Sequence, residues 1–122
     1  MPVFDTHCHL GLDGKATPDD EHARAVAADV TAMLVVGIDA ATSRAASELV
    51  RLPGVRWSSG LHPNDSSRLV AEWPEIERLA RLPHCAAIGE TGLDCYRDRV
   101  PLAEQEVSLR RHLALARELD LP

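Results

Sequence analysis

At 122 residues, with 45% hydrophobic and 26% charged residues, the chain has the size and composition of one soluble globular domain with a modest core. Its net charge of −6 argues against a broad basic surface for nucleic acids, and its 3% aromatic residues argue against a platform for stacking bases. No apolar run reaches the ~18 residues that span a bilayer, and the three cysteines lack C-x-x-C spacing, so we expect a cytoplasmic protein with neither membrane contacts nor disulfides.

The chain opens with a short apolar pair, Val3 and Phe4, which predicts a strand that leads into Asp5, His7 and His9. Side chains along a strand alternate between its two faces, so these three polar residues are expected on one face. Two neutral imidazoles that lie side by side can bind one divalent metal ion. A hydrogen-bonded histidine pair is the alternative, and the spacing alone does not decide between them.

Helical and apolar patterns then alternate along the first half of the chain. Thr17 and Pro18 form a helix-start signal, and apolar residues at helical spacing predict a helix over residues 18–28. The continuous apolar run over residues 31–37 predicts a strand that is buried on both faces. Asp39 follows this strand and is a candidate cap for the next helix.

The same alternation continues in the second half of the chain. Residues 55–60 predict a third strand, which delivers His62, and Pro74 is expected to open the helix that follows. Residues 85–89 predict a fourth strand, which delivers Glu90.

A long helix from Leu102 to Leu119 is the last predicted element. Gln105 is expected to fix the preceding loop onto this helix. The expected core face of the helix is Leu102, Leu109, Leu113 and Ala116. Three histidines are expected on the surface: His22, His84 and His112. All three cysteines are expected to be small buried side chains: Cys8, which points away from the histidine face, Cys85 and Cys95.

Four βα units of roughly 30 residues each are typical of parallel sheets. They can form an open doubly wound sheet or half of an eight-stranded barrel. His7, His9, His62 and Glu90 all lie at or just beyond strand ends, where the βα loops of barrels build their sites, and the glycine-rich phosphate loop common in open sheets is missing. We therefore predict an α/β fold of four consecutive βα units, the N-terminal half of a TIM-type (β/α)8 barrel.

Several motifs support this choice when they are taken together and in chain order. They are Asp5-Thr6-His7-Cys8-His9-Leu10, Gly60-Leu61-His62-Pro63, Ile88-Gly89-Glu90-Thr91-Gly92-Leu93-Asp94, Tyr96-Arg97-Asp98 and the closing Leu121-Pro122. In this combination the chain resembles the TatD-like metal-dependent deoxyribonucleases, which belong to the amidohydrolase-type barrel group. The resemblance covers the whole chain and implies that residues 1–122 form a single partial domain, the first half of such a barrel.

The resemblance implies a hydrolase that cleaves DNA phosphodiester bonds with water activated by divalent metal ions, two in the complete site and either Mg, Mn or Zn. By position, His7 and His9 would hold the first ion, and Glu90 would be the catalytic carboxylate that bridges it to the second. His62 and Arg97 would contact the substrate. The plain alternatives are a turn histidine for His62 and a solvated loop charge for Arg97.

Two further functional hypotheses stay open. The ligands that would complete the family's site belong to later strands, which this chain does not include. The chain can therefore be a catalytically inactive half-barrel that associates with a second copy or with another chain, because unpaired strand edges favour association. The third hypothesis is a related barrel hydrolase that acts on a different phosphoester or on an amide.

Overall fold

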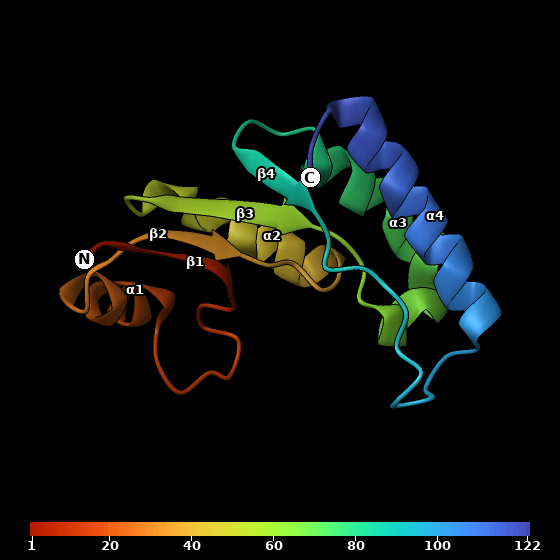
Figure 1. Ribbon diagram of the computed structural model, residues 1–122, viewed down its shortest axis with the longest axis horizontal. Helices are drawn as coiled ribbons and strands as arrows, with labels where there is room; N and C mark the ends of the chain where they lie inside the picture. The colour runs from red at the N-terminus through yellow and green to blue at the C-terminus, as the bar shows by residue number, and fades with distance from the viewer.

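A computed structural model describes residues 1–122 as four strands that alternate with helices (Figure 1). The strands are β1 (Val3–Cys8), β2 (Val30–Val35), β3 (Val55–Ser59) and β4 (Cys85–Ile88). The α-helices are α1 (Pro18–Ala27), α2 (Ala40–Glu48), α3 (Leu69–Ala80) and α4 (Leu102–Leu119). Two short 3-10 helices are also present, η1 (Leu49–Arg51) and η2 (Pro63–Arg68). No helix combines the length and the apolar character needed to cross a membrane.

The four strands form one parallel sheet in the order β1-β2-β3-β4. A doubly wound sheet reverses its strand order at a switch point, whereas a barrel adds each new strand next to the preceding one. The observed order is that of a barrel, and the four predicted βα units are confirmed. All four arrows in Figure 1 point the same way, so the loops that follow the strands gather at one end of the sheet.

One face of the sheet packs against α2 and α3 and forms the main core, which comprises Val35, Ala46, Leu49, Val55, Trp57, Leu79 and Cys85. The opposite face is partly open and contains a hollow of about 240 Å³ lined by residues such as Leu34, Ser58 and Ala87. The prediction that β2 is buried on both faces is therefore wrong, because Leu34 is only half-buried and Thr31 is exposed.

Helix α3 begins at Leu69, five residues before the predicted start at Pro74, which lies inside the helix. A proline there lacks the amide that would donate to the carbonyl four residues earlier. That carbonyl belongs to Val70, a residue that is 85% exposed, so water can replace the missing donor. The helix turns Ile76, Leu79 and Ala80 into the core, where all three are buried.

Helix α4 has the predicted bounds but buries a different face. Its buried residues are Gln105, Ser108, His112 and Leu115. The predicted core residue Leu113 is instead 56% exposed, and Leu102 is also exposed. The reason is that much of this face covers irregular backbone before η2 and after β4 rather than a flat apolar sheet, and that backbone needs hydrogen-bonding side chains.

Two of the three histidines expected on the surface are buried. His22 is on the buried side of α1 with its Nε2 2.9 Å from the Pro53 carbonyl oxygen, and His112 is buried in α4. His84 is exposed, as predicted. All three cysteines are free thiols, but Cys95 is exposed rather than buried.

Candidate metal centre

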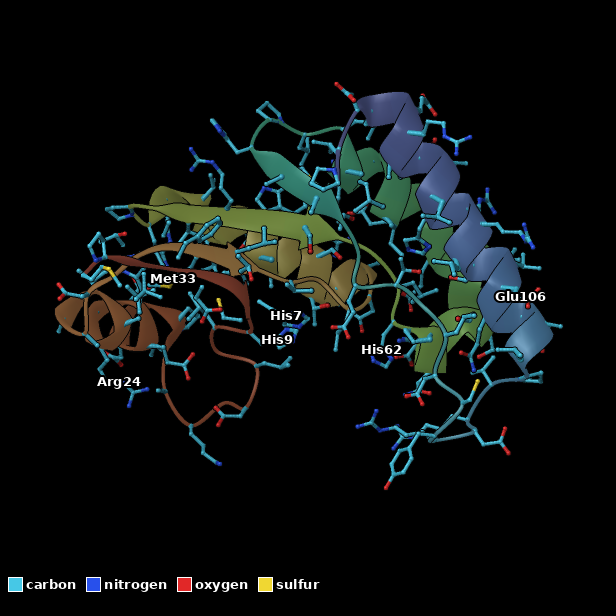
Figure 2. All side chains as sticks on the ribbon, viewed as in Figure 1. His7, His9, Arg24, Met33, His62 and Glu106 are labelled. Carbon is cyan, nitrogen blue, oxygen red and sulfur yellow. The ribbon has the colours of Figure 1, made fainter.

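All four predicted polar candidates lie close together at the carboxyl end of the sheet. Figure 2 shows His7 and His9 where β1 ends and His62 on the segment that follows β3. Glu90 comes two residues after the last residue of β4. The prediction that different strands deliver these side chains to a common rim therefore holds in space.

Strand β1 carries an irregularity where it reaches the site. Asp5 is paired with Met33 and Cys8 with Val35, so β1 takes three steps while β2 takes two. An extra residue of this kind is a β-bulge, which bends the strand and changes the direction of nearby side chains. His7 lies within the bulge, and its backbone amide donates to the Asp5 carboxylate at 3.0 Å.

The two imidazoles and the carboxylate converge. His7 Nε2 lies 3.3 Å from His9 Nε2 and 3.4 Å from Glu90 Oε2. One potential ligand atom from each of these residues falls within 4.8 Å of the other two. Such a set is suited to a divalent cation, because neutral imidazole nitrogens and carboxylate oxygens both coordinate such ions.

The second bond of His9 determines which of its nitrogens is available. His9 Nδ1 lies 3.0 Å from the Val36 carbonyl oxygen, which can only accept a hydrogen bond. Nδ1 must therefore carry the proton, and the lone pair of Nε2 faces His7 and Glu90. A ring nitrogen held by a backbone carbonyl in this way is the usual outer support of a metal-ligating histidine.

His62 has the opposite arrangement. Its Nδ1 accepts a hydrogen bond from the Asn64 amide at 3.1 Å, so in the neutral ring the proton is on Nε2. Nε2 lies 3.5 Å from Glu90 Oε1. His62 is thus the turn histidine of the plain alternative, because it caps η2. Its Nε2 also lies at the rim of the site, and the predicted substrate contact stays a prediction.

Glu90 is held by close packing of backbone at the strand ends. Its amide donates to the Gly37 carbonyl at 2.7 Å, and the preceding Gly89 carbonyl accepts from the Ser58 hydroxyl at 2.7 Å. A Cβ on Gly60 would lie within 2.5 Å of the Gly89 Cα, so only glycine fits there. The Gly89–Glu90 peptide bond is cis.

The loop after Glu90 is organised around Asp94. Its carboxylate accepts from the backbone amides of Tyr96 and Arg97 and from the Asn64 side chain. These hydrogen bonds, with the Arg97 amide as the largest contribution, hold the pKa of Asp94 far below its usual range. Gln105 fastens the loop to α4, as predicted, because it accepts from the Asp94 amide at 2.6 Å and donates to the Val100 carbonyl at 2.7 Å.

Arg97 is half-exposed on this loop, and one of its terminal nitrogens is 3.0 Å from the Asp94 carboxylate. It borders a cavity of about 430 Å³ that His62 and Glu90 also line. Arg97 therefore lies on the same side of the centre as His62, although Asp94 takes part of its hydrogen-bonding capacity.

Asn64 and His112 are structural supports that the sequence reasoning missed. Asn64 immediately follows the histidine motif, and its position in a Pro-Asn-Asp turn sequence was an available signal. His112 offered no comparable signal, because its partner is a backbone amide 51 residues away.

Cys8 is not a candidate for the centre. It is half-buried, and its Sγ lies 3.5 Å from the Leu34 carbonyl. Burial, followed by the charges of Asp5 and Glu21, raises its pKa to about 11. It therefore stays a protonated thiol at neutral pH, and a protonated thiol is a poor ligand and nucleophile.

The chain is similar to known proteins in sequence and in fold. The 3'-5' ssDNA/RNA exonuclease TatD of Citrobacter koseri is 41% identical over 106 residues, which are 85% of this chain and 41% of that protein. The metal-dependent hydrolase YabD of Bacillus subtilis is 35% identical over 125 residues, covering 98% of this chain and 48% of that protein. The chain thus spans less than half the length of these relatives.

A solved structure supports the same relationship. The crystal structure of YjjV, a TatD homologue from Escherichia coli K12, superposes with a TM-score of 0.85 at 28% identity, over 98% of this chain and 48% of that one. The predicted half of a TIM-type barrel is confirmed by this likeness. The profile of the family described as TatD related DNase matches residues 4–122. The chain belongs to the TatD-related DNase family.

Proposed function

We propose that His7, His9 and Glu90 hold a divalent metal ion in a nuclease that hydrolyses phosphodiester bonds of DNA. The observation that carries this proposal is the convergence of two imidazoles from β1 and one carboxylate after β4, with ligand atoms within 4.8 Å of one another. The names of the relatives, which include 3'-5' ssDNA/RNA exonucleases, support nucleic acid as the substrate class. A second ion, as in the complete family site, needs ligands beyond these three.

Each residue has a distinct role in this proposal. A bound divalent ion would supply positive charge that lowers the pKa of water and offsets the charge of a phosphate. The Val36 carbonyl holds the His9 ring so that its Nε2 faces the centre. Glu90 is the catalytic carboxylate, with Oε2 toward His7 and Oε1 toward His62.

His62 and Arg97 are proposed to bind the substrate. His62 keeps its Nε2 proton directed into the rim, where it can donate to a phosphate oxygen. Arg97 borders the same cavity, and the rest of its guanidinium is available for a second phosphate contact. Local contacts of this kind are necessary because the chain as a whole carries a net charge of −6 and repels a polyanion.

The test is the release of nucleotides from single-stranded DNA in the presence of Mg²⁺, Mn²⁺ or Zn²⁺. We expect activity that requires one of these ions and that Glu90→Gln abolishes, since glutamine keeps the shape but loses the ligand charge. Glu106→Gln is the matched control, because Glu106 is an exposed glutamate on α4, well separated from the centre (Figure 2). Metal-dependent release at equal rates by wild type and Glu90→Gln contradicts the proposal.

A second candidate is a half-barrel without activity of its own that pairs with another chain or a second copy. The observation that favours it is the apolar edge at β1, where Val3 is 49% exposed and Phe4 is 56% exposed. Light scattering coupled to size-exclusion chromatography measures this directly. A concentration-dependent dimer that Phe4→Asp abolishes supports pairing, and a monomer at all concentrations rules out pairing of two copies.

The third hypothesis, a barrel hydrolase for another phosphoester or an amide, is tested by the same variants on those substrates. The name of the Bacillus subtilis relative specifies only a metal-dependent hydrolase, which is compatible with this alternative. We also propose a cytoplasmic location, which the three free thiols support.

A further inference from the structure

A buried histidine outside the metal centre lies directly beneath the segment that carries His62. His112 on α4 is 1% exposed, and its ring meets the Trp73 ring edge to face with the centroids 5.0 Å apart. The proposed chemistry does not use it. A histidine in an apolar interior costs solvation unless both ring nitrogens are satisfied, so its partners indicate what it does.

Both nitrogens of His112 have backbone partners. Nδ1 lies 2.7 Å from the Ser108 carbonyl oxygen, one helical turn earlier, and Nε2 lies 3.0 Å from the Leu61 amide nitrogen. A carbonyl only accepts and an amide only donates, so the ring must be neutral with its proton on Nδ1. Burial, together with the charge of Arg111, holds the pKa of His112 below its ordinary value and keeps the ring in this form.

The Leu61 amide lies in the turn between β3 and η2 and relies on His112 as its acceptor. The amide of the next residue, His62, donates to the Ile38 carbonyl at 2.8 Å, and the amide of Gly60 is 3.3 Å from the Ser43 hydroxyl. Three consecutive amides are thus held from two segments: Ile38 and Ser43 lie just before and at the start of α2, and His112 alone belongs to α4. The Leu61 side chain is fully buried, so water cannot easily replace a lost acceptor.

We propose that His112 is a positioning residue: by accepting the Leu61 amide it fixes the turn that directs the His62 ring toward Glu90. The importance of that direction rests on the proposed function, but the hydrogen bond and its effect on the turn do not. His112 acts on the centre from outside, through the backbone.

Two substitutions of His112 distinguish the effect of its hydrogen-bond acceptor from the effect of its aromatic ring. His112→Gln keeps both bonds, because the Gln amide carries a donor and an acceptor at nearly the spacing of the two imidazole nitrogens. His112→Phe keeps an aromatic ring against Trp73 but provides no acceptor. His22→Phe is the matched control, since His22 is another buried histidine with a backbone partner, the Pro53 carbonyl, away from the centre.

The experiment is amide hydrogen exchange followed by NMR in the metal-free 122-residue chain. In His112→Phe we expect the Leu61 amide to exchange ~10- to 100-fold faster relative to the Trp57 amide, the range for a buried donor left unpaired. The same ratio should change by less than about threefold in His112→Gln and in His22→Phe. Equal acceleration of Leu61 and Trp57 in His112→Phe means a general loss of stability and overturns the proposal.

The His62 ring supplies the readout that a merely structural role would not change. Its carbon-bound ring signals should match wild type in His112→Gln and should shift or broaden in His112→Phe. Unchanged His62 signals in His112→Phe overturn the positioning role. If His112→Phe does not fold, the ring nitrogen spectrum of wild type still decides, because a proton on Nε2 of His112 is incompatible with the proposed bond.

Activity adds an independent check. Where nuclease activity is measured, the effects of His112→Phe and His62→Ala should not add in the double variant, because one acts through the other. Additive effects overturn the proposal. Absence of nuclease activity in wild type affects the proposed function alone, since the exchange and ring measurements need neither metal nor substrate.

Discussion

The first βα unit and the last two are packed very differently, although all belong to one sheet. Within residues 1–28, His22 is the only buried residue. In β3, by contrast, every residue except Arg56 is buried, and Leu61, Ile76 and Leu79 are fully or almost fully buried. Strand β1 has a neighbour on one side only, whereas β3 is paired on both sides and covered by α2 and α3.

The residues of the candidate centre come from both of these regions. His7 and His9 come from the loosely packed first unit, and Glu90 and His62 come from the firmly packed second half. A metal ion that joins the two sets would therefore fasten the edge strand to the rest of the sheet. Metal binding and the stability of β1 should therefore be coupled.

The largest expected effect on stability is in the firmly packed second half of the chain. Ile76→Ala should lower the free energy of unfolding by about 2–5 kcal/mol, because it empties a fully buried site. Phe4→Ala removes a larger side chain but should cost less than about 1 kcal/mol, since that ring is 56% exposed. Urea denaturation of both variants measures this difference. A larger loss of unfolding free energy for Phe4→Ala than for Ile76→Ala would contradict it.

A bound metal ion should stabilise the loosely packed first βα unit. At a free Mn²⁺ concentration of about 100 times Kd, the free energy of unfolding should rise by ~2.7 kcal/mol, because the ion binds only the folded chain. Hydrogen exchange can be measured with Mg²⁺ as the bound ion in place of Mn²⁺. The gain in protection should then concentrate in β1, at residues 3–8. His7→Ala should remove both effects, whereas His84→Ala, which changes an exposed histidine, should retain them.

A smaller effect is expected at the loop after β4. Gln105→Ala should lower the free energy of unfolding by about 1–3 kcal/mol, because it leaves the Asp94 amide and the Val100 carbonyl without their partner. Glu106→Ala, at the exposed neighbouring position, should change it by less than about 0.5 kcal/mol. Thermal or urea unfolding checks both, and similar losses would show that the loop does not depend on Gln105.

The smallest expected effect is a pH dependence from His112. Its pKa in the folded chain lies below the ordinary 6.5, so as pH falls the unfolded chain takes up this proton first. The folded state should therefore lose stability from about pH 6.5 downward until the lower folded pKa is reached. His112→Gln should reduce this slope between pH 7 and pH 5, and an unchanged slope would mean that other groups cause it.

The regular parts of the fold were predictable because local patterns determine them. The alternation of apolar runs and helical spacing gave all four strands, and Asp39 caps α2 with the expected geometry. Pro74 misled because proline opens helices more often than it continues them, and here an exposed Val70 makes the interior position tolerable.

The buried face of α4 could not be predicted, because it depends on irregular backbone from other segments. Gln105 was anticipated as a loop anchor, but the Leu61 amide that His112 binds is a long-range partner with no local signal. The same holds at the centre. The motifs located His7, His9 and Glu90, whereas the bulge in β1 and the carbonyl that selects the His9 nitrogen arise from the pairing of β1 with β2 and have no local signal.

The most direct test of the central claim is a Mn²⁺ titration of the labelled chain followed by NMR, because this ion broadens signals close to its binding site. We predict that the side-chain signals of His7, His9 and Glu90 disappear together at substoichiometric Mn²⁺, while the rings of His22 and His84 stay sharp. Loss of the histidine signals with Glu90 unaffected, or no selective broadening at any of the three, would contradict the account.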